Sequence, residues 1–426
     1  MEPGATPTLK RVAIIFSGGP APAANAVITA AASAFLRAGT SVIGILNGYS
    51  ALQDYNAETR PLVEGEDYIF LQPKDLRGQR NSRGIMLGTA RAHPGREISN
   101  PADLSDPEKT GRIGRVFQAL VDLQIDGLIS IGGDGTLMTA NTLHRYQETL
   151  PESAGRVRIV HVPKTIDNDY SGIDFTFGFF TAVDVMSKSL LNLRADAIAT
   201  RSYFVVEVMG RMAGWLGYGV SIAGEAHMVV GVEDVVDDLV DNAAGPRPGA
   251  IPVYLDLDAL CERIRRLIEV REAQGKHYGV VVLTEGLVEL LPPQVVEGLP
   301  RDEHGMLSLS KLNIGKMVAE RTTHHLQEQG TPKKITGVQL GYEARCAVPH
   351  AFDVVLGSQL GHGAWRALEE EGANACMVSM TGQMQHRLIA FADLVDAQTL
   401  QTTTRLISPS SDFHRLAHGL ATRLQP

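Results

Sequence analysis

Two apolar runs, each followed at once by a polar loop, constrain this chain more than any other feature. Residues 127–131 and 157–162 are rich in β-branched and aliphatic side chains. The loop Gly-Gly-Asp-Gly-Thr follows the first run at residues 132–136, and Pro-Lys-Thr-Ile-Asp-Asn-Asp follows the second at residues 163–169. Buried runs separated by one helical segment are typical of parallel strands. Both loops should therefore lie at carboxyl ends of strands, where α/β sheets bind ligands.

The first loop has the features of a phosphate site. Its three glycines remove every β-carbon that would keep backbone N–H groups away from an anion, and a helix beginning near Thr136 points its positive end at the same place. Asp134 repels phosphate, so its presence indicates a Mg²⁺ held between carboxylate and phosphates. A tight strand-to-helix turn with an acidic N-cap is the structural alternative.

The second loop suits proton transfer. Pro163 should end the strand, and the loop then places Asp167 and Asp169 two residues apart, so that in an extended segment both carboxylates point the same way. Near Lys164, one aspartate could remove a proton from a hydroxyl while the other orients its partners. A solvated turn rich in Asp and Asn is the alternative.

These loops, together with Val-Glu-Val-Met-Gly-Arg at residues 206–211, closely resemble the 6-phosphofructokinase family. That family transfers a phosphoryl group to the C1 hydroxyl of fructose 6-phosphate, and the resemblance runs from about residue 12 to about residue 361. It implies two Rossmann-like α/β domains with mainly parallel sheets and the active site in the cleft between them. The expected domains are a phosphoryl-donor domain (9–177 and about 351–395), a sugar-phosphate domain (178–350) and a tail packed on the body (396–426).

Composition agrees with a globular α/β enzyme. The 426 residues are 44% hydrophobic but only 6% aromatic, with 43 glycines for tight strand-to-helix turns. A net charge of −9 argues against a nucleic-acid surface. The three cysteines lack metal-ligand spacing, and neither a signal peptide nor a membrane span is indicated. A reduced, cytoplasmic protein is expected.

The resemblance also assigns residues to the phosphoryl donor. Residues 11–16 form a predicted strand that runs into Gly18 and Gly19, which allow close approach of a ligand. Arg91 matches the arginine that the family brings to the transferring phosphoryl group; a surface arginine is the alternative. The donor-binding set is then Gly18, Gly19, Arg91, Gly133, Gly135 and Thr136, with Asp134 as the metal ligand.

For the sugar phosphate, the resemblance points to loops after three further strands. Glu285 matches a ligand of the sugar hydroxyls, and the alternative is that it caps the N-terminus of a helix. Arg345 matches an arginine that holds the 6-phosphate, often from a neighbouring subunit. The substrate set is Thr165, Asp167, Asp169, Met209, Gly210, Arg211, Glu285, Tyr342 and Arg345. A homodimer or homotetramer is implied.

The resulting prediction is in-line phosphoryl transfer with Mg²⁺. Asp167 acts as the base, Lys164 and Thr165 position the phosphoryl group, and Arg91 stabilises the transition state. Pyrophosphate-using relatives typically carry Asp where Gly135 stands, so Gly135 leaves room for the α-phosphate of ATP. Lys164 is typical of pyrophosphate users. Steric exclusion is the harder constraint, so ATP is favoured and pyrophosphate is the alternative.

Two other classes of protein compete with this prediction. NAD kinases and lipid kinases also carry a Gly-Gly-Asp-Gly-Thr loop. We expect neither the second loop, Pro-Lys-Thr-Ile-Asp-Asn-Asp, nor Met-Gly-Arg in those kinases. A non-catalytic regulatory subunit is the other class, and the presence of Asp134, Thr165, Asp167 and Arg211 argues against it.

Overall fold

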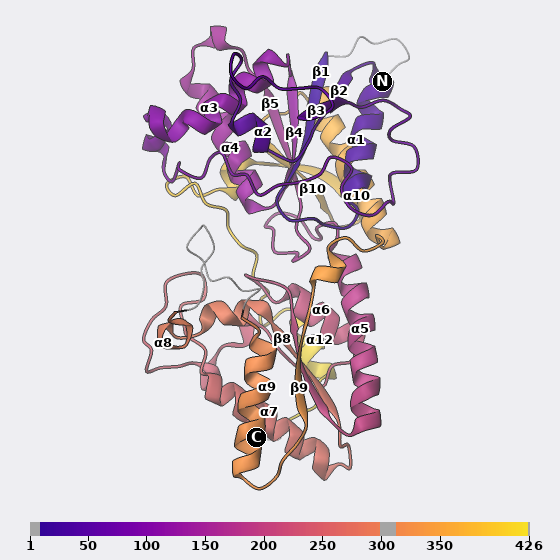
Figure 1. The fold of residues 1–426 in the computed structure, drawn as a ribbon, viewed down its shortest axis with the longest axis vertical. Coiled ribbons are helices and arrows are strands. Elements are labelled where there is room, and N and C mark those ends of the chain that lie inside the picture. The colour runs from indigo at the N-terminus through magenta and orange to yellow at the C-terminus, as the bar shows by residue number, and fades with distance from the viewer. Residues whose placement is uncertain (1–8, 299–311, 425–426) are drawn as a thin grey trace. The chain divides into compact units, whose positions relative to one another are not determined.

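A computed structural model of the chain describes residues 9–298 and 312–424. The chain forms two compact units (Figure 1). Unit 1 comprises the described residues up to Ile166, together with Tyr170–Thr181 and Arg345–Thr403. Unit 2 comprises Asp167–Asp169, the described residues of Ala182–Ala344, and those from Thr404 onward.

Unit 1 is built on a seven-stranded sheet in the order β11-β10-β5-β4-β1-β2-β3. The five inner strands are parallel, and only the edge strands β3 and β11 run antiparallel to their neighbours. The predicted apolar runs form the centre of this sheet, which confirms the mainly parallel α/β prediction. The strands are β1 (Arg11–Ser17), β2 (Ser41–Ile45), β3 (Tyr68–Phe70), β4 (Gly127–Gly132), β5 (Arg158–Pro163), β10 (Cys376–Thr381) and β11 (Gln385–Ala390).

Helices cover both faces of this sheet. Figure 1 shows α3 (Pro107–Asp122) and α4 (Asp134–Thr149) on one face, and α1 (Ala24–Ala38) and α10 (Ala351–Trp365) on the other. Small residues let α1 and α10 approach closely, since a β-carbon added to Gly361 would lie 2.2 Å from the Val27 carbonyl oxygen. Shorter helices are α2 (Ser50–Gln53) and α11 (Phe391–Leu394).

Ala23, directly before α1, adopts a left-handed conformation with φ of 66°. Glycine adopts this backbone conformation without strain, whereas a residue with a β-carbon does not. The chain therefore places an alanine where the backbone suits a glycine.

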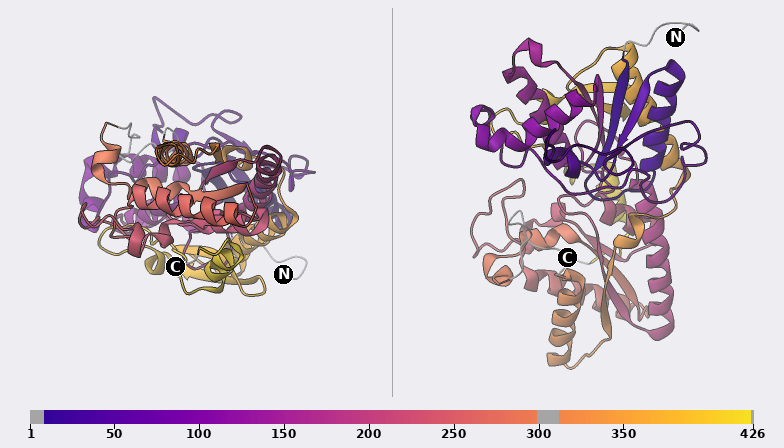
Figure 2. Two further views of the ribbon diagram at one scale, coloured as in Figure 1. Left: turned by 90° about the horizontal axis from the view of Figure 1, so that it is seen from below. Right: turned by 45° about the horizontal axis from the view of Figure 1, so that its top comes forward.

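Unit 2 has a fully parallel four-stranded sheet in the order β7-β8-β6-β9. Helices α7 and α9 pack against each other on one face, while α6 and α12 pack together on the other (Figure 2). The elements are β6 (Tyr203–Val208), β7 (Met228–Val230), β8 (Gly279–Thr284), β9 (Ile335–Leu340), α5 (Phe179–Thr200), α6 (Trp215–Gly224), α7 (Leu257–Ala273), α8 (Pro293–Val296), α9 (Ile314–Glu328) and α12 (Asp412–Leu420).

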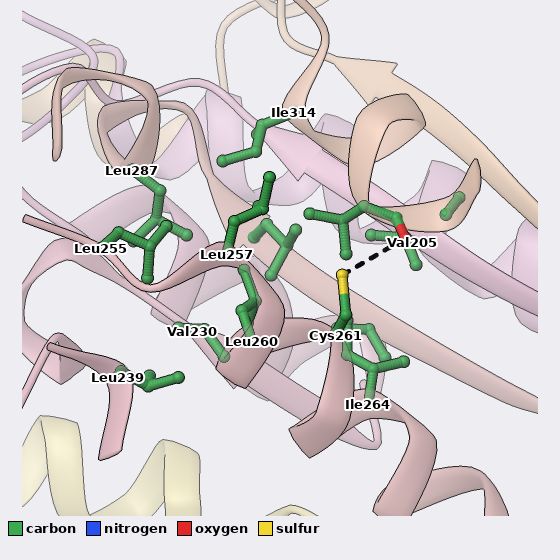
Figure 3. Close-up of a cluster of buried hydrophobic side chains, with 14 of the residues drawn as sticks. Val205, Val230, Leu239, Leu255, Leu257, Leu260, Cys261, Ile264, Leu287 and Ile314 are labelled. Atoms are coloured by element: carbon green, nitrogen blue, oxygen red, sulfur yellow. Dashed lines mark hydrogen bonds between the residues drawn. The ribbon is translucent and has the colours of Figure 1, made fainter. Parts of the chain in front are cut away.

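The core of unit 2 lies beneath α7. Leu260, Cys261 and Ile264 of this helix pack against Val205 of β6 and Val230 of β7 (Figure 3). These side chains are completely or almost completely buried. Each fully buried aliphatic side chain stabilises the fold by roughly 1.5–3 kcal/mol relative to its exposed state, so the packing of α7 on the sheet contributes to the stability of unit 2.

The start of the long helix α5 is set by a glycine. The helix begins at Phe179, because Gly178 has a φ of 94° that no right-handed helix contains. Towards the C-terminal end, residues up to Thr403 belong to unit 1 and the described residues from Thr404 belong to unit 2. Within the described ranges, no helix is both long enough and apolar enough to cross a bilayer.

Candidate active site

The predicted donor-binding residues of unit 1 follow three adjacent strands. In the parallel register, Ser17 of β1 pairs with Gly132 of β4, and Gly132 pairs with Pro163 of β5. The loops that begin at Gly18, Gly133 and Lys164 therefore leave one edge of the sheet side by side. Parallel strands present their carboxyl ends at a common edge, so three loops far apart in sequence become neighbours.

The glycine loop after β4 folds tightly into α4. A β-carbon on Gly132 would lie 2.2 Å from Thr136 Oγ1, so only glycine fits there. Gly133 is the N-cap residue in extended conformation, and Asp134 is the first residue of the helix. The positive end of α4 therefore begins at this loop, as an anion site requires.

Lys164 carries positive charge to the same loops. Its ammonium nitrogen lies 3.4 Å from the position of a β-carbon on Gly18 and 3.8 Å from that of a β-carbon on Gly133. The Lys164 backbone N–H donates to the Gly132 carbonyl at 2.8 Å, and the residue is 7% exposed. The Lys164 ammonium thus lies at contact distance from both glycine loops.

Arg91 and Arg345 are both associated with the loop after β1. The Ala90 carbonyl accepts hydrogen bonds from the Gly18 N–H at 2.9 Å and from the Ser17 hydroxyl at 3.1 Å, which places the exposed Arg91 beside the glycine loop. Arg345 Nη1 lies 2.5 Å from the position of a β-carbon on Gly19, so its guanidinium packs on that glycine. Arg345 belongs to unit 1.

Gly135 is bounded by a side chain that the sequence did not single out. A β-carbon added to Gly135 would lie 2.9 Å from Cδ2 of His93. The space expected to be open for an α-phosphate is therefore lined by an imidazole. No sequence motif identifies His93, because its contact with Gly135 depends on the path of the loop that follows Arg91.

His161 of β5 lies beneath these loops and stays neutral. Burial lowers its pKa to about 3, and its Nε2 lies 3.2 Å from the Tyr170 hydroxyl. The nearby Lys164 ammonium acts in the same direction. Positive charge at this edge therefore comes from lysine and arginine side chains, and His161 has a structural role between β5 and Tyr170.

The backbone from Asp167 to Asp169 is not extended as expected. Asn168 adopts a left-handed conformation with φ of 57°. The prediction that both carboxylates point the same way assumed an extended segment, and that assumption is wrong. Asp169 is buried and Asp167 is half-buried. Arg405, which sequence reasoning missed, donates from its backbone N–H to the Asp169 carbonyl at 2.7 Å and from Nη2 to the Asn168 carbonyl at 2.6 Å.

The predicted sugar-phosphate residues of unit 2 also follow adjacent strands. Val208 of β6 pairs with Thr284 of β8 and with Leu340 of β9. A β-carbon on Gly341 would lie 2.0 Å from Cγ of Met209, so this glycine makes room for the methionine. The loops that carry Met209, Glu285 and Tyr342 therefore leave one edge of the sheet together.

Hydrogen bonds and an ion pair order this second edge. The Gly210 N–H donates to Glu285 Oε2 at 3.4 Å, and the Gly286 N–H donates to the Gly210 carbonyl at 3.0 Å. Arg211 pairs with Glu289 at 2.7 Å. Glu285 is the first residue of a 3₁₀ helix, Glu285–Leu290, whose N-cap is Thr284, so the alternative role of an N-cap is wrong for Glu285. Tyr342 is 61% exposed.

The residues after β4 fit a magnesium ion. Mg²⁺ prefers hard oxygen ligands and usually keeps water and substrate phosphates in its shell. Asp134 supplies such an oxygen at the start of α4, next to a turn where only glycine fits at position 132. One carboxylate beside an anion-binding loop is the donor set that a phosphate-bridged Mg²⁺ requires.

Comparison with known proteins agrees with these features. A family described as Phosphofructokinase matches residues 11–368. A pyrophosphate--fructose 6-phosphate 1-phosphotransferase of Thermotoga maritima is 29% identical over 98% of this chain and 91% of its own length. An ATP-dependent 6-phosphofructokinase of Corynebacterium efficiens is 32% identical over 90% of this chain and 93% of its own length.

Solved structures share the fold. A pyrophosphate-dependent phosphofructokinase from Nitrosospira multiformis matches 98% of this chain and 93% of its own, with a TM-score of 0.66 at 17% identity. Phosphofructokinase from Saccharomyces cerevisiae matches 90% of this chain with a TM-score of 0.64 at 21% identity, although this chain spans only 44% of the yeast chain. The family match covers most of the described residues and both sets of loops, and the chain therefore belongs to the phosphofructokinase family.

Proposed function

We propose that this chain is a 6-phosphofructokinase that transfers a phosphoryl group from ATP to the C1 hydroxyl of fructose 6-phosphate. The observation that carries phosphoryl transfer, with either donor, is the position of the Lys164 ammonium beside Gly18 and Gly133, at the start of α4. Backbone donors, a helix N-terminus and a buried cation at one sheet edge are suited to a polyphosphate. Both named relatives act on fructose 6-phosphate, as their names state.

Each part of the reaction has a residue suited to it. Asp167 accepts the proton of the C1 hydroxyl, while Lys164 and Thr165 position the phosphoryl group for in-line transfer. Arg91 stabilises charge on the transferring oxygens. Asp134 would hold a Mg²⁺, which when bound neutralises charge on the donor phosphates. The donor contacts are Gly18, Gly19, Gly133, Gly135 and Thr136, and the sugar-phosphate contacts are Asp169, Met209, Gly210, Arg211, Glu285, Tyr342 and Arg345.

Pyrophosphate is the second candidate donor, and two observations favour it. The Lys164 ammonium is buried between the glycine loops, and His93 lines the space beside Gly135 that an α-phosphate would need. ATP remains our proposal because an imidazole can rotate, whereas a side chain at position 135 would occupy that space permanently.

The test is a comparison of initial rates with ATP and with pyrophosphate at equal free Mg²⁺, with fructose 6-phosphate as acceptor and fructose 1,6-bisphosphate as the measured product. We expect the higher rate with ATP. A higher rate with pyrophosphate would make pyrophosphate the donor, and the proposed transfer to fructose 6-phosphate would stand. If neither donor yields product, the proposal fails. Phosphorylation of NAD or of a lipid would then indicate another kinase, and the absence of both activities would indicate a non-catalytic subunit.

A further inference from the structure

A partly buried cluster of two histidines and one carboxylate lies in unit 2, and none of its three residues is assigned to the reaction above. Asp234 ends a 3₁₀ turn (Val232–Asp234) after β7, and His414 and His418 are four residues apart on α12. Residues i and i+4 lie on one face of a helix, so both imidazoles face the same way. Their Nε2 atoms lie 2.8 Å and 2.9 Å from the same oxygen, Asp234 Oδ1.

We propose that Asp234, His414 and His418 bind a divalent transition metal ion, Zn²⁺ being the first candidate, which joins α12 to the turn after β7. One carboxylate oxygen and two imidazole nitrogens, all within 4.8 Å of one another, form a ligand set that such metals prefer. Nothing in this proposal depends on the phosphotransfer reaction.

Further hydrogen bonds orient the carboxylate. Asp234 Oδ2 accepts hydrogen bonds from the Tyr218 hydroxyl at 2.8 Å and from the Gly231 N–H at 2.7 Å, which leaves Oδ1 directed at the histidines. Hydrogen bonds of this kind to a ligating carboxylate belong to the outer shell of a metal site.

A proton is the alternative to a metal ion at this cluster. With a proton on Nε2, each histidine would donate a hydrogen bond to Asp234 Oδ1, and the cluster would be a hydrogen-bonded contact between α12 and the turn after β7.

The cluster can open to metal distances with a small movement. Zn²⁺ ligands lie about 2.0–2.2 Å from the ion, so tetrahedral ligand atoms are about 3.4 Å apart. The Nε2–Oδ1 separations need to grow by about half an ångström to reach that value. The His418 side chain is 37% exposed, whereas that of Asp234 is 7% exposed, so the histidine can move and water can complete the shell.

The test measures zinc directly on the full-length chain. Protein stripped with a chelator is titrated calorimetrically with ZnCl₂ in buffer containing a large excess of Mg²⁺, which occupies oxygen-rich sites but competes poorly for imidazole. All proteins carry Cys346→Ser, because this exposed thiol could bind zinc by itself. We expect one zinc per chain and a rise in the unfolding temperature when zinc is added.

Three variants identify the ligands. His414→Gln and His418→Gln should each weaken zinc binding at least about tenfold, since each removes one of three protein ligands. His324→Gln is the matched control, because His324 also lies near a carboxylate, Glu328, four residues along a helix, and should bind zinc as wild type does. Unchanged zinc binding in both ligand variants, or no saturable binding by the parent protein, would overturn the proposal in favour of a protonated His414.

Since His418 is partly exposed, His418→Gln should fold normally. Its unfolding temperature without zinc should match that of the parent, and only the increase caused by zinc should disappear. If the variant is already destabilised without metal while the parent gains nothing from zinc, the cluster is a hydrogen-bonded contact of α12 and the metal assignment is wrong.

Discussion

Lys164 places its ammonium nitrogen 3.4 Å from the point where a side chain on Gly18 would begin. The two residues belong to loops after β5 and β1, which are separated in the sheet by β4. The ammonium of one residue therefore lies at van der Waals distance from the open side of the other.

Gly18→Ala tests this relationship. The new methyl group would lie 3.4 Å from the ammonium and narrow the space in which a donor phosphate reaches it, so we expect a KM for the phosphoryl donor raised roughly tenfold or more. Gly18 has a φ of 91°, which itself destabilises alanine by roughly 1–2 kcal/mol. Gly65→Ala is the matched control, because Gly65 has a φ of 89° with no atom within 4 Å of an added β-carbon. Both variants should lose similar stability, and only Gly18→Ala should change donor kinetics; equal donor KM values would contradict the proposed contact.

Asp167→Ser tests the base. Removal of a general base lowers kcat by roughly 10²- to 10⁴-fold, and the half-buried side chain should leave stability nearly unchanged. Steady-state kinetics with a melting curve measure both effects. The control is Asp184→Asn, which removes an exposed charge paired with Lys188 at 2.6 Å and should keep wild-type turnover. Ordinary turnover by Asp167→Ser would show that the base lies elsewhere.

Gly135→Asp tests donor choice. The added side chain begins 2.9 Å from His93, so it pushes the imidazole aside and fills the space assigned to an α-phosphate. We expect the ratio of ATP-dependent to pyrophosphate-dependent rate to fall at least about tenfold. Gly135→Asp combined with His93→Ala separates the two effects. If the double variant regains ATP-dependent activity, the single variant lost that activity because the new side chain collides with His93. If the ratio of ATP-dependent to pyrophosphate-dependent rate is unchanged in Gly135→Asp, Gly135 does not determine which donor is used.

Glu207 predicts a pH dependence of stability. Burial raises its pKa to about 7 from 4.5, although Gln339 and the Gly315 N–H hydrogen-bond to its carboxylate at 2.8 Å and 3.3 Å. The folded state then holds this proton more tightly than the unfolded state. Stability should fall as pH rises from about 4.5 to about 7, by roughly 2–3 kcal/mol in total.

Glu207→Gln should remove that pH-dependent loss and leave the variant more stable than wild type at pH 8. Denaturant unfolding curves from pH 5 to pH 8 measure this difference. Glu320→Gln, an exposed partner of Lys316 at 3.8 Å, is the control and should leave the pH profile as it is in wild type. A Glu207→Gln profile parallel to that of wild type would mean that Glu207 titrates normally.

Ala23→Gly should stabilise unit 1. The left-handed φ of 66° disfavours alanine, and relief of that strain exceeds the extra chain entropy of glycine, for a net gain of roughly 0.5–1 kcal/mol. Ala26→Gly, three residues further into α1, should instead destabilise by about 1 kcal/mol. Thermal unfolding measures both. A loss of stability in Ala23→Gly would show that this backbone conformation is not held in solution.

The strand ends were predictable because a single rule locates them. Apolar runs that stop at glycine or proline gave β4 and β5 within one residue, since both the run and its terminator are local in sequence. The left-handed Asn168 was not predictable, because most asparagines in polar loops adopt other conformations and tertiary contacts select this one.

Contacts between distant residues were the larger omission. His93 meets Gly135, and Arg405 meets Asp169, through loops whose paths no local pattern encodes. The histidines of α12 did carry a signal, His-x-x-x-His on a short amphipathic helix, but their partner Asp234 lies 180 and 184 residues away. A spacing typical of ligands on one helix indicates a site only when the third ligand is known.

The division of unit 2 has a consequence for synthesis. Its sheet is made from residues 203–340, yet α12, which packs on α6 and supplies two histidine partners of Asp234, follows only after β10 and β11 have been made for unit 1. About 70 further residues therefore separate the last strand of this sheet from the start of α12, and the ribosome adds them at roughly 5–20 residues per second. During those seconds α6 lacks its partner helix, and the nascent chain is exposed to chaperones and proteases.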